Sequence, residues 1–220
     1  QRRRAGTSFD PGELAFNQRY QWRVDEIGPS GTVPGHTWPF TTGDFLTVND
    51  FEFYPDDAAI RSAWVHNIPG GFDYVFCETG TLHQGARAMR LTYQNQYEPF
   101  FTEATCAFDA PHNWTRRGVD TLSLAFRGEE ENLEQPMYLT LTDVASNSAT
   151  VTHPLTYAVQ TEHWRQWDLD LAEFAAAGVD LTAVAGMTIG LGDATQSAQP
   201  PDDLDTIYLD HIRLRALATD

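Results

Sequence analysis

The stretch Ile207-Tyr208-Leu209-Asp210-His211-Ile212-Arg213-Leu214, near the end of the chain, alternates apolar and polar residues. The stretch Val48-Asn49-Asp50-Phe51-Glu52, near its start, does the same. A period of two is typical of a strand with one buried face. Between the two stretches lie about 150 residues of short strand-like runs, broken by Gly, Pro, Asn and Asp. The pattern predicts an all-β, antiparallel β-sandwich whose first and last strands lie side by side.

Runs of this kind predict strands at 47–53, 73–78, 87–94, 100–108, 120–127, 136–143, 149–153, 164–170, 186–191 and 206–215. Alanine and glutamate favour a helix at 171–177, with Gly178 as its stop, and a short helix is expected at 56–64. The alternation places two sets of side chains inside the sandwich: Met89, Leu91, Tyr93 and Leu122, Leu124, Phe126.

The N-terminal part differs from the rest, because residues 12–43 contain only two predicted strands, 20–26 and 36–42, joined by Gly- and Pro-rich turns. Two strands alone are marginally stable in water. Burial of Trp22, Trp38 and Phe40 would contribute roughly 2–3 kcal/mol each. We therefore expect this segment to pack on the main sandwich or on another copy of the chain. The predicted organisation is a hairpin and linker at 1–44, a sandwich at 45–216 and a tail at 217–220.

The 220 residues include 31 acidic and 14 basic ones, and every basic residue is an arginine, so the net charge is −17. Such a chain repels phosphate backbones and anionic membranes, and the lack of lysine excludes Schiff-base chemistry. No apolar run approaches the ~20 residues of a membrane helix, which argues against membrane insertion. Arg2-Arg3-Arg4 precedes no apolar segment, so we expect a piece of a longer protein that is secreted or on the cell surface. Cys77 and Cys106 form either a disulfide or two buried thiols.

Several motifs carry a family resemblance: Asn49-Asp50-Phe51-Glu52, the run 85–93, the run 122–128, Ile189-Gly190-Leu191-Gly192-Asp193 and the run 207–212. They resemble the galactose-binding-like jelly rolls, of the carbohydrate-binding-module type, in large secreted proteins of planctomycete-type bacteria. The run 20–26 and the ending Gly35-His36-Thr37-Trp38-Pro39-Phe40-Thr41-Thr42 resemble the last two strands of a fibronectin type III-like domain.

This resemblance implies a structural calcium ion that pins the first strand to the last. Glu52 and Asp210 match the metal-binding acids of the family, Asp50 would share the face of Glu52, and the turn around Gly85 would supply backbone carbonyls. In the alternative interpretation Asp50 and Glu52 are solvated charges at a strand edge. Asp210 would then bond Arg213 or the backbone.

A polar, outward face is the candidate ligand site, because sugar recognition combines aromatic rings with planar polar groups. Its predicted members are Arg90, Phe101, Glu103, Arg127, Tyr138 and Asp193. Two arginines there would favour an anionic or hydroxyl-dense glycan. Alternatively, Arg127 pairs with Glu103 or Asp193 and only braces the strands. Trp64 and Tyr97, in or beside loops, offer a second platform unless they plug the end of the sandwich.

The function predicted from the sequence is non-catalytic binding of a polysaccharide or oligosaccharide, next to other domains of a larger protein that can include a carbohydrate-active enzyme. A ligand-free spacer is the first alternative. A jelly-roll lyase or glycosidase is the second, with Glu103 and Asp193 as its only plausible acid–base pair. The seven histidines lack the spacing of a catalytic zinc motif, and the chain has no GxSxG motif.

Overall fold

The computed structural model describes residues 8–68, 72–96, 99–193 and 204–216. The chain forms two compact units, Gln1–Phe45 and Leu46–Asp220. In the first unit, β1 (Arg19–Arg23) pairs with β4 (Thr37–Thr41), and β2 (Glu26–Gly28) pairs with β3 (Gly31–Val33). The rings of Trp22 and Trp38 stack across β1 and β4, yet both stay about half exposed, at 53% and 52%. The hairpin itself therefore does not bury them, and their packing on another surface stays a prediction.

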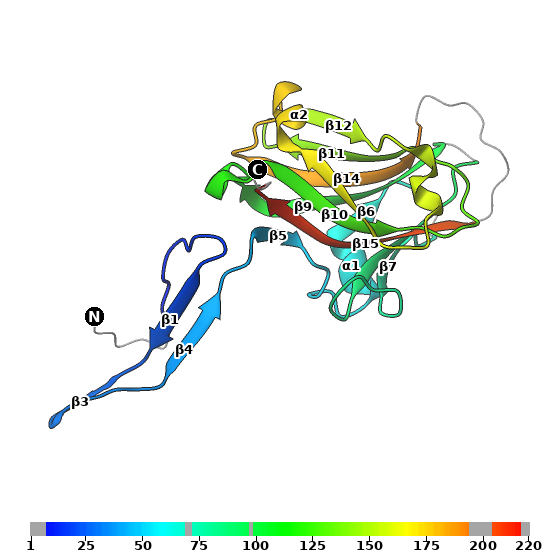
Figure 1. The fold of residues 1–220 in the computed structure, drawn as a ribbon. Coiled ribbons are helices and arrows are strands. Elements are labelled where there is room, and N and C mark those ends of the chain that lie inside the picture. Colours follow the sequence, from blue (N-terminus) through cyan, green and yellow to red (C-terminus); the bar gives the residue numbers. More distant parts are fainter. Residues whose placement is uncertain (1–7, 69–71, 97–98, 194–203, 217–220) are drawn as a thin grey trace. The chain divides into compact units, whose positions relative to one another are not determined.

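The second unit is an antiparallel sandwich of two sheets, as predicted, and Figure 1 shows the two layers. One layer, the six-stranded sheet, has the order β13-β10-β15-β8-β7, with β5 (Phe45–Asn49) also paired to β15. The strands are β13 (Arg165–Asp170), β10 (Thr121–Arg127), β15 (Asp205–Arg215), β8 (Ala88–Tyr93) and β7 (Val75–Glu78). The pairing of β5 with β15 confirms that the first and last strands of the sandwich lie side by side.

The other layer, the five-stranded sheet, has the order β12-β11-β14-β9-β6. Its strands are β12 (Ser148–Thr152), β11 (Met137–Asp143), β14 (Val184–Gly192), β9 (Phe101–His112) and β6 (Trp64–His66). Two predicted helices are present, α1 (Asp57–Ala63) and α2 (Leu171–Ala176), and Asp56 and Asp170 accept N-terminal N–H groups as their caps. Two short 3₁₀ turns, η1 (Arg116–Gly118) and η2 (Thr156–Gln160), complete the elements.

The core lies between the sheets and contains both predicted sets of apolar side chains. Met89, Leu91 and Tyr93 are fully buried, and so are their counterparts on β10, Leu122, Leu124 and Phe126. Each such side chain contributes roughly 1.5–3 kcal/mol by leaving water. The cysteines are free thiols, Cys77 on β7 and Cys106 on β9, and so belong to different sheets.

The strand predicted at 47–53 ends earlier, at Asn49. The side chain of Asn49 accepts the N–H of Phe51, and Asp50 accepts the N–H of Glu52. These short-range bonds close a turn in which Phe51 has a φ of 62°. Asp50 and Glu52 therefore lie in a turn, and the prediction that they share one strand face is wrong.

Strand β15 carries a bulge that its sequence already shows. Its buried apolar residues are Ile207 and Leu209 in the first half and Ile212 and Leu214 in the second, so the alternation changes from odd to even positions. The register with β10 shifts at the same place, and His211 has a φ of 49°. The extra residue places Asp210 and His211 together at the bulge.

Candidate functional site

The outer face of the five-stranded sheet is polar and rich in threonine. On β11, β14 and β9, the residues between the core positions form rungs across the sheet, one of which joins Thr140, Thr188 and Thr105. The hydroxyl of Thr105 bonds that of Thr188 at 2.8 Å, and Thr140 bonds Thr150 of β12 at 2.7 Å. This face therefore offers hydroxyl groups in rows along the strands.

The neighbouring rung consists of Tyr138, Gly190 and Glu103. A Cβ atom placed on Gly190 would lie 2.1 Å from Cζ of Tyr138 and 2.5 Å from its hydroxyl oxygen. The tyrosine ring therefore lies across the glycine, in the space that any other side chain would fill. Beyond the glycine, the Tyr138 hydroxyl donates a hydrogen bond of 2.8 Å to Oε1 of Glu103.

The charge around Tyr138 is negative. Burial raises the pKa of its hydroxyl far above the ordinary value, and the carboxylates of Glu103 and Asp193 raise it further. The hydroxyl is therefore a neutral donor held by a carboxylate. Glu103 is fixed in turn by Asn67, whose Oδ1 accepts the Glu103 N–H at 2.7 Å and whose own N–H donates to the Glu103 carbonyl.

Three of the residues predicted for this polar face, Phe101, Glu103 and Tyr138, thus lie on strands of this sheet, and Asp193 directly follows the end of β14. Glu103 and Tyr138 are in contact, and Asp193 is close enough to influence the pKa of Tyr138. Phe101 is two residues before Glu103 on β9, opposite Gly192 and next to the end of β14. The sequence did not reveal that Gly190 makes room for the ring.

The two predicted arginines lie on the other sheet, so the prediction that they share a face with Glu103 and Tyr138 is wrong. Arg90 and Arg127 flank Tyr208 of β15 in register. The guanidinium of Arg90 lies 4.3 Å from the ring centre of Phe76, and Nη2 of Arg127 lies 3.7 Å from Glu129. Arg127 therefore does not brace β10 against Glu103.

The loop platform predicted from Trp64 and Tyr97 does not form around Trp64. This side chain opens β6 and is fully buried, with its ring centre 5.9 Å from that of Phe51. It belongs to the core and offers no surface to a ligand. Tyr97 lies outside the described residues.

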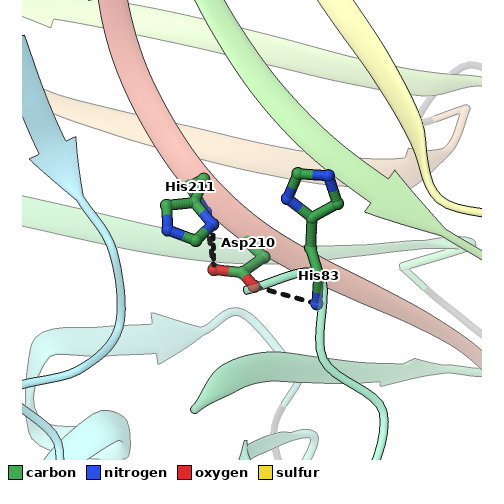
Figure 2. A group of neighbouring side chains, drawn as sticks. All are labelled: His83, Asp210 and His211. Carbon is green, nitrogen blue, oxygen red and sulfur yellow. Dashed lines mark hydrogen bonds and ion pairs between the residues drawn. The ribbon is translucent and has the colours of Figure 1, made fainter. Parts of the chain in front are cut away.

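Asp210 is fully buried below the loop between β7 and β8. Its Oδ2 atom accepts the backbone N–H groups of His83 and Gln84, both at 3.1 Å, and its Oδ1 atom accepts the N–H of His211 at 2.7 Å. Figure 2 shows the carboxylate between the loop and His211. These bonds agree with the alternative to the calcium site, in which Asp210 bonds the backbone.

Glu52 holds the next part of the same loop. Its Oε1 atom accepts the N–H groups of Ala86 at 2.8 Å and Arg87 at 3.1 Å. Gly85 has a φ of 74°, and a Cβ there would lie 2.0 Å from Oε1 of Glu52. The glycine lets the loop approach the carboxylate closely.

These residues fit a calcium ion poorly. Calcium takes six to eight oxygen ligands, including backbone carbonyls. Here the loop turns its N–H groups toward Glu52 and Asp210 instead. Among the described residues, one group of three possible ligands has all its ligand atoms within 4.8 Å of one another, and it consists of His83, Asp210 and His211. Two of its three donors are nitrogens.

Burial is the main cause of the pKa shifts of Asp210 and His211. It raises the pKa of Asp210, against the opposing effect of the N–H donors and of His211, and it lowers the pKa of His211, against the opposing charge of Asp210. The ring of His83 lies edge-on to that of His211, with centres 5.6 Å apart, and 5.5 Å from the ring of Trp164. Neither histidine was predicted from the sequence as a possible ligand. The change of alternation in β15 marks the bulge that places His211 beside Asp210, whereas His83 reaches it from the loop between β7 and β8.

Comparison with known proteins gives similarity of fold alone. No protein-family model and no curated protein matches the chain. Among solved structures, a family 30 carbohydrate-binding module matches with a TM-score of 0.49 and 15% identity, over 70% of this chain and 78% of that one. A family 11 module from Clostridium thermocellum matches with a TM-score of 0.49 and 10% identity, over 78% of this chain and 94% of that one.

An agarase matches with a TM-score of 0.50 and 11% identity, over 79% of this chain but 24% of its own length. The fibronectin-like character of the N-terminal hairpin and the bacterial source stay predictions. Among the described residues, no helix is long and apolar enough to cross a membrane.

Proposed function

We propose that the sandwich binds a neutral polysaccharide or oligosaccharide, without cleaving it, through the outer face of the five-stranded sheet. The observation that carries the proposal is the ring of Tyr138, which lies across Gly190 with its hydroxyl bonded to Glu103. A ring fixed along a sheet can stack on the C–H face of a sugar. The bond to Glu103 fixes the ring before the ligand arrives, which lowers the entropy lost on binding.

The groups around the ring suit hydroxyls. The carboxylates of Glu103 and Asp193 accept hydrogen bonds from sugar hydroxyls, and the threonine hydroxyls both donate and accept them. The expected ligand is neutral, because this face carries carboxylates while Arg90 and Arg127 lie on the other sheet. The net charge of −17 also repels polyanions. The proposal includes secretion, as part of a larger extracellular protein.

Calorimetric titration of the whole chain tests the proposal. The panel contains soluble neutral glycans (β-glucan, galactan, xylan, agaro-oligosaccharides) and two anionic ones (alginate, polygalacturonate). Tyr138→Ala should weaken binding to the neutral ligand about tenfold, which corresponds to about 1.4 kcal/mol of stacking energy. The matched control is Tyr208→Ala, which removes a tyrosine from the outer face of the six-stranded sheet and should leave the affinity unchanged.

Three results would overturn the proposal. Full affinity in a folded Tyr138→Ala protein would remove this face as the site. No binding to any glycan of the panel would favour the ligand-free spacer. Release of reducing ends or unsaturated products would favour an enzyme, with Glu103 and Asp193 as the carboxylate pair to replace next.

A further inference from the structure

We propose that His83, Asp210 and His211 form a binding site for a divalent transition metal of the zinc type. Their ligand atoms all lie within 4.8 Å of one another. Figure 2 shows His211 on one side of the Asp210 carboxylate and the backbone nitrogen of His83 on the other. This site is on the six-stranded sheet and does not involve the face around Tyr138, so it stands apart from the proposed glycan binding.

The distance between His211 and Asp210 agrees with both residues binding the same metal ion. Nδ1 of His211 lies 3.1 Å from Oδ1 of Asp210. Two ligands of a tetrahedral zinc ion with bonds of about 2.0–2.1 Å are roughly 3.3 Å apart. A cation between these two atoms therefore needs only a small adjustment of the rings.

Nδ1 of His211 also has no other bond to satisfy it. It is buried, and the described part of the chain gives it no hydrogen bond of acceptable geometry despite its closeness to Asp210. A buried ring nitrogen without a hydrogen bond is costly, and a metal ion would use its lone pair. The bulge at His211, with its φ of 49°, holds the nitrogen in this place.

Backbone N–H groups orient Asp210, as hydrogen bonds from outer groups commonly orient a metal ligand. Three N–H groups, those of His83, Gln84 and His211, fix its two oxygens. His83 is exposed on the loop, and its ring lies beside those of His211 and Trp164. The metal would tie this loop to β15 by its side chains, in addition to the existing backbone bonds.

The donor types select the class of metal. Two imidazole nitrogens and one carboxylate oxygen suit Zn²⁺, Cu²⁺ or Ni²⁺, whereas Ca²⁺ and Mg²⁺ take oxygen ligands. Three protein ligands leave a fourth position, which water would fill. The site is therefore expected to discriminate strongly between zinc and calcium.

The test is calorimetric titration of the whole chain with ZnCl₂ and, separately, with CaCl₂, together with melting curves and the visible spectrum of a Co²⁺ sample. We expect one zinc ion per chain, a higher melting temperature with zinc, and Co²⁺ bands of tetrahedral intensity. His83→Asn and His211→Asn should each lower zinc affinity at least tenfold. His163→Asn, which removes an exposed histidine outside the group, is the matched control and should bind as the native chain does.

His83→Asn is the informative variant, because His83 is exposed and the change leaves the backbone bonds to Asp210 in place. Equal zinc binding by this folded variant and the native chain would show an adventitious ion only and overturn the site. No zinc binding by the native chain would do the same. Stabilisation by calcium but not by zinc would overturn it in favour of an oxygen-ligand site.

Discussion

Replacement of Gly190 by alanine should displace the Tyr138 ring and destabilise the sandwich by about 1–2 kcal/mol. The new Cβ would lie 2.1 Å from Cζ, 2.4 Å from Cε2 and 2.5 Å from the hydroxyl oxygen of Tyr138. Carbon atoms in contact prefer about 3.5–4.0 Å, so the ring must move by more than 1 Å. The 2.8 Å bond to Glu103 cannot survive such a shift.

The expected loss of stability in Gly190→Ala is the difference between destabilising and stabilising effects. A hydrogen bond to a charged group is worth about 1.5–3 kcal/mol, and this one lies at the lower end because both partners are partly exposed. The ring also loses its contact with the sheet. Against this, alanine reduces the freedom of the unfolded chain and stabilises by about 0.4–1 kcal/mol. Alanine can adopt the backbone at Gly190, whose φ is not positive.

Urea unfolding measures this effect, and a cost of 1–2 kcal/mol should lower the midpoint by roughly 0.5–1 M. In a Tyr138→Ala background the added methyl meets no ring, so Gly190→Ala should there be neutral or slightly stabilising. An equal cost in both backgrounds, or no cost in the native protein, would refute the reasoning. Gly190→Ala should also lower glycan affinity as Tyr138→Ala does.

Two pH effects are expected as well. Burial lowers the pKa of His153, so the stability that the neutral ring contributes is complete above the unfolded pKa of about 6.5 and is lost as the pH falls toward the lower folded pKa. His153→Gln should therefore flatten the change in unfolding free energy between pH 7.5 and 5. An equal slope in His153→Gln and in the control His163→Gln would contradict this. The backbone N–H of Asp180 and the side chain of Asn147 lower the pKa of Asp143, so its carboxylate stabilises the fold above the unfolded pKa of about 3.9 and loses this effect as the pH falls through the folded pKa. The loss of unfolding free energy caused by Asp143→Asn should therefore be largest at neutral pH and smallest near pH 2. A loss that does not depend on pH would count against it.

The candidate glycan face was only half predictable. Alternation along β9 and β11 places Glu103 and Tyr138 outward, and the same reasoning places Arg90 and Arg127 outward on β8 and β10. Alternation does not say which sheet a strand joins, because that depends on pairing with strands far away in the sequence. The four residues therefore looked like one face, and the pairing of β9 with β14 and of β10 with β15 divides them between two.

The proximity of His83, Asp210 and His211 could be recognised only in the tertiary structure, for a related reason. His83 and Asp210 are separated by more than a hundred positions, and the loop meets the carboxylate only because β7, β8 and β15 are neighbours in one sheet. The bulge at His211 is different, since the change of apolar positions from Leu209 to Ile212 is readable in the sequence. A parity change of this kind predicts a bulge directly.

The sequence by itself determined most of the strands of the sandwich, the inward side chains and the antiparallel sandwich, because a period of two and the turn residues between runs are local properties of the chain. It did not predict β6, which follows α1 directly. Only the tertiary structure decided that Tyr138 lies across Gly190 toward Glu103, and that Asp210 accepts N–H groups from the loop at His83. The reason is that strand order and register arise from contacts between distant segments, whose free energy is not encoded in any single stretch of the chain.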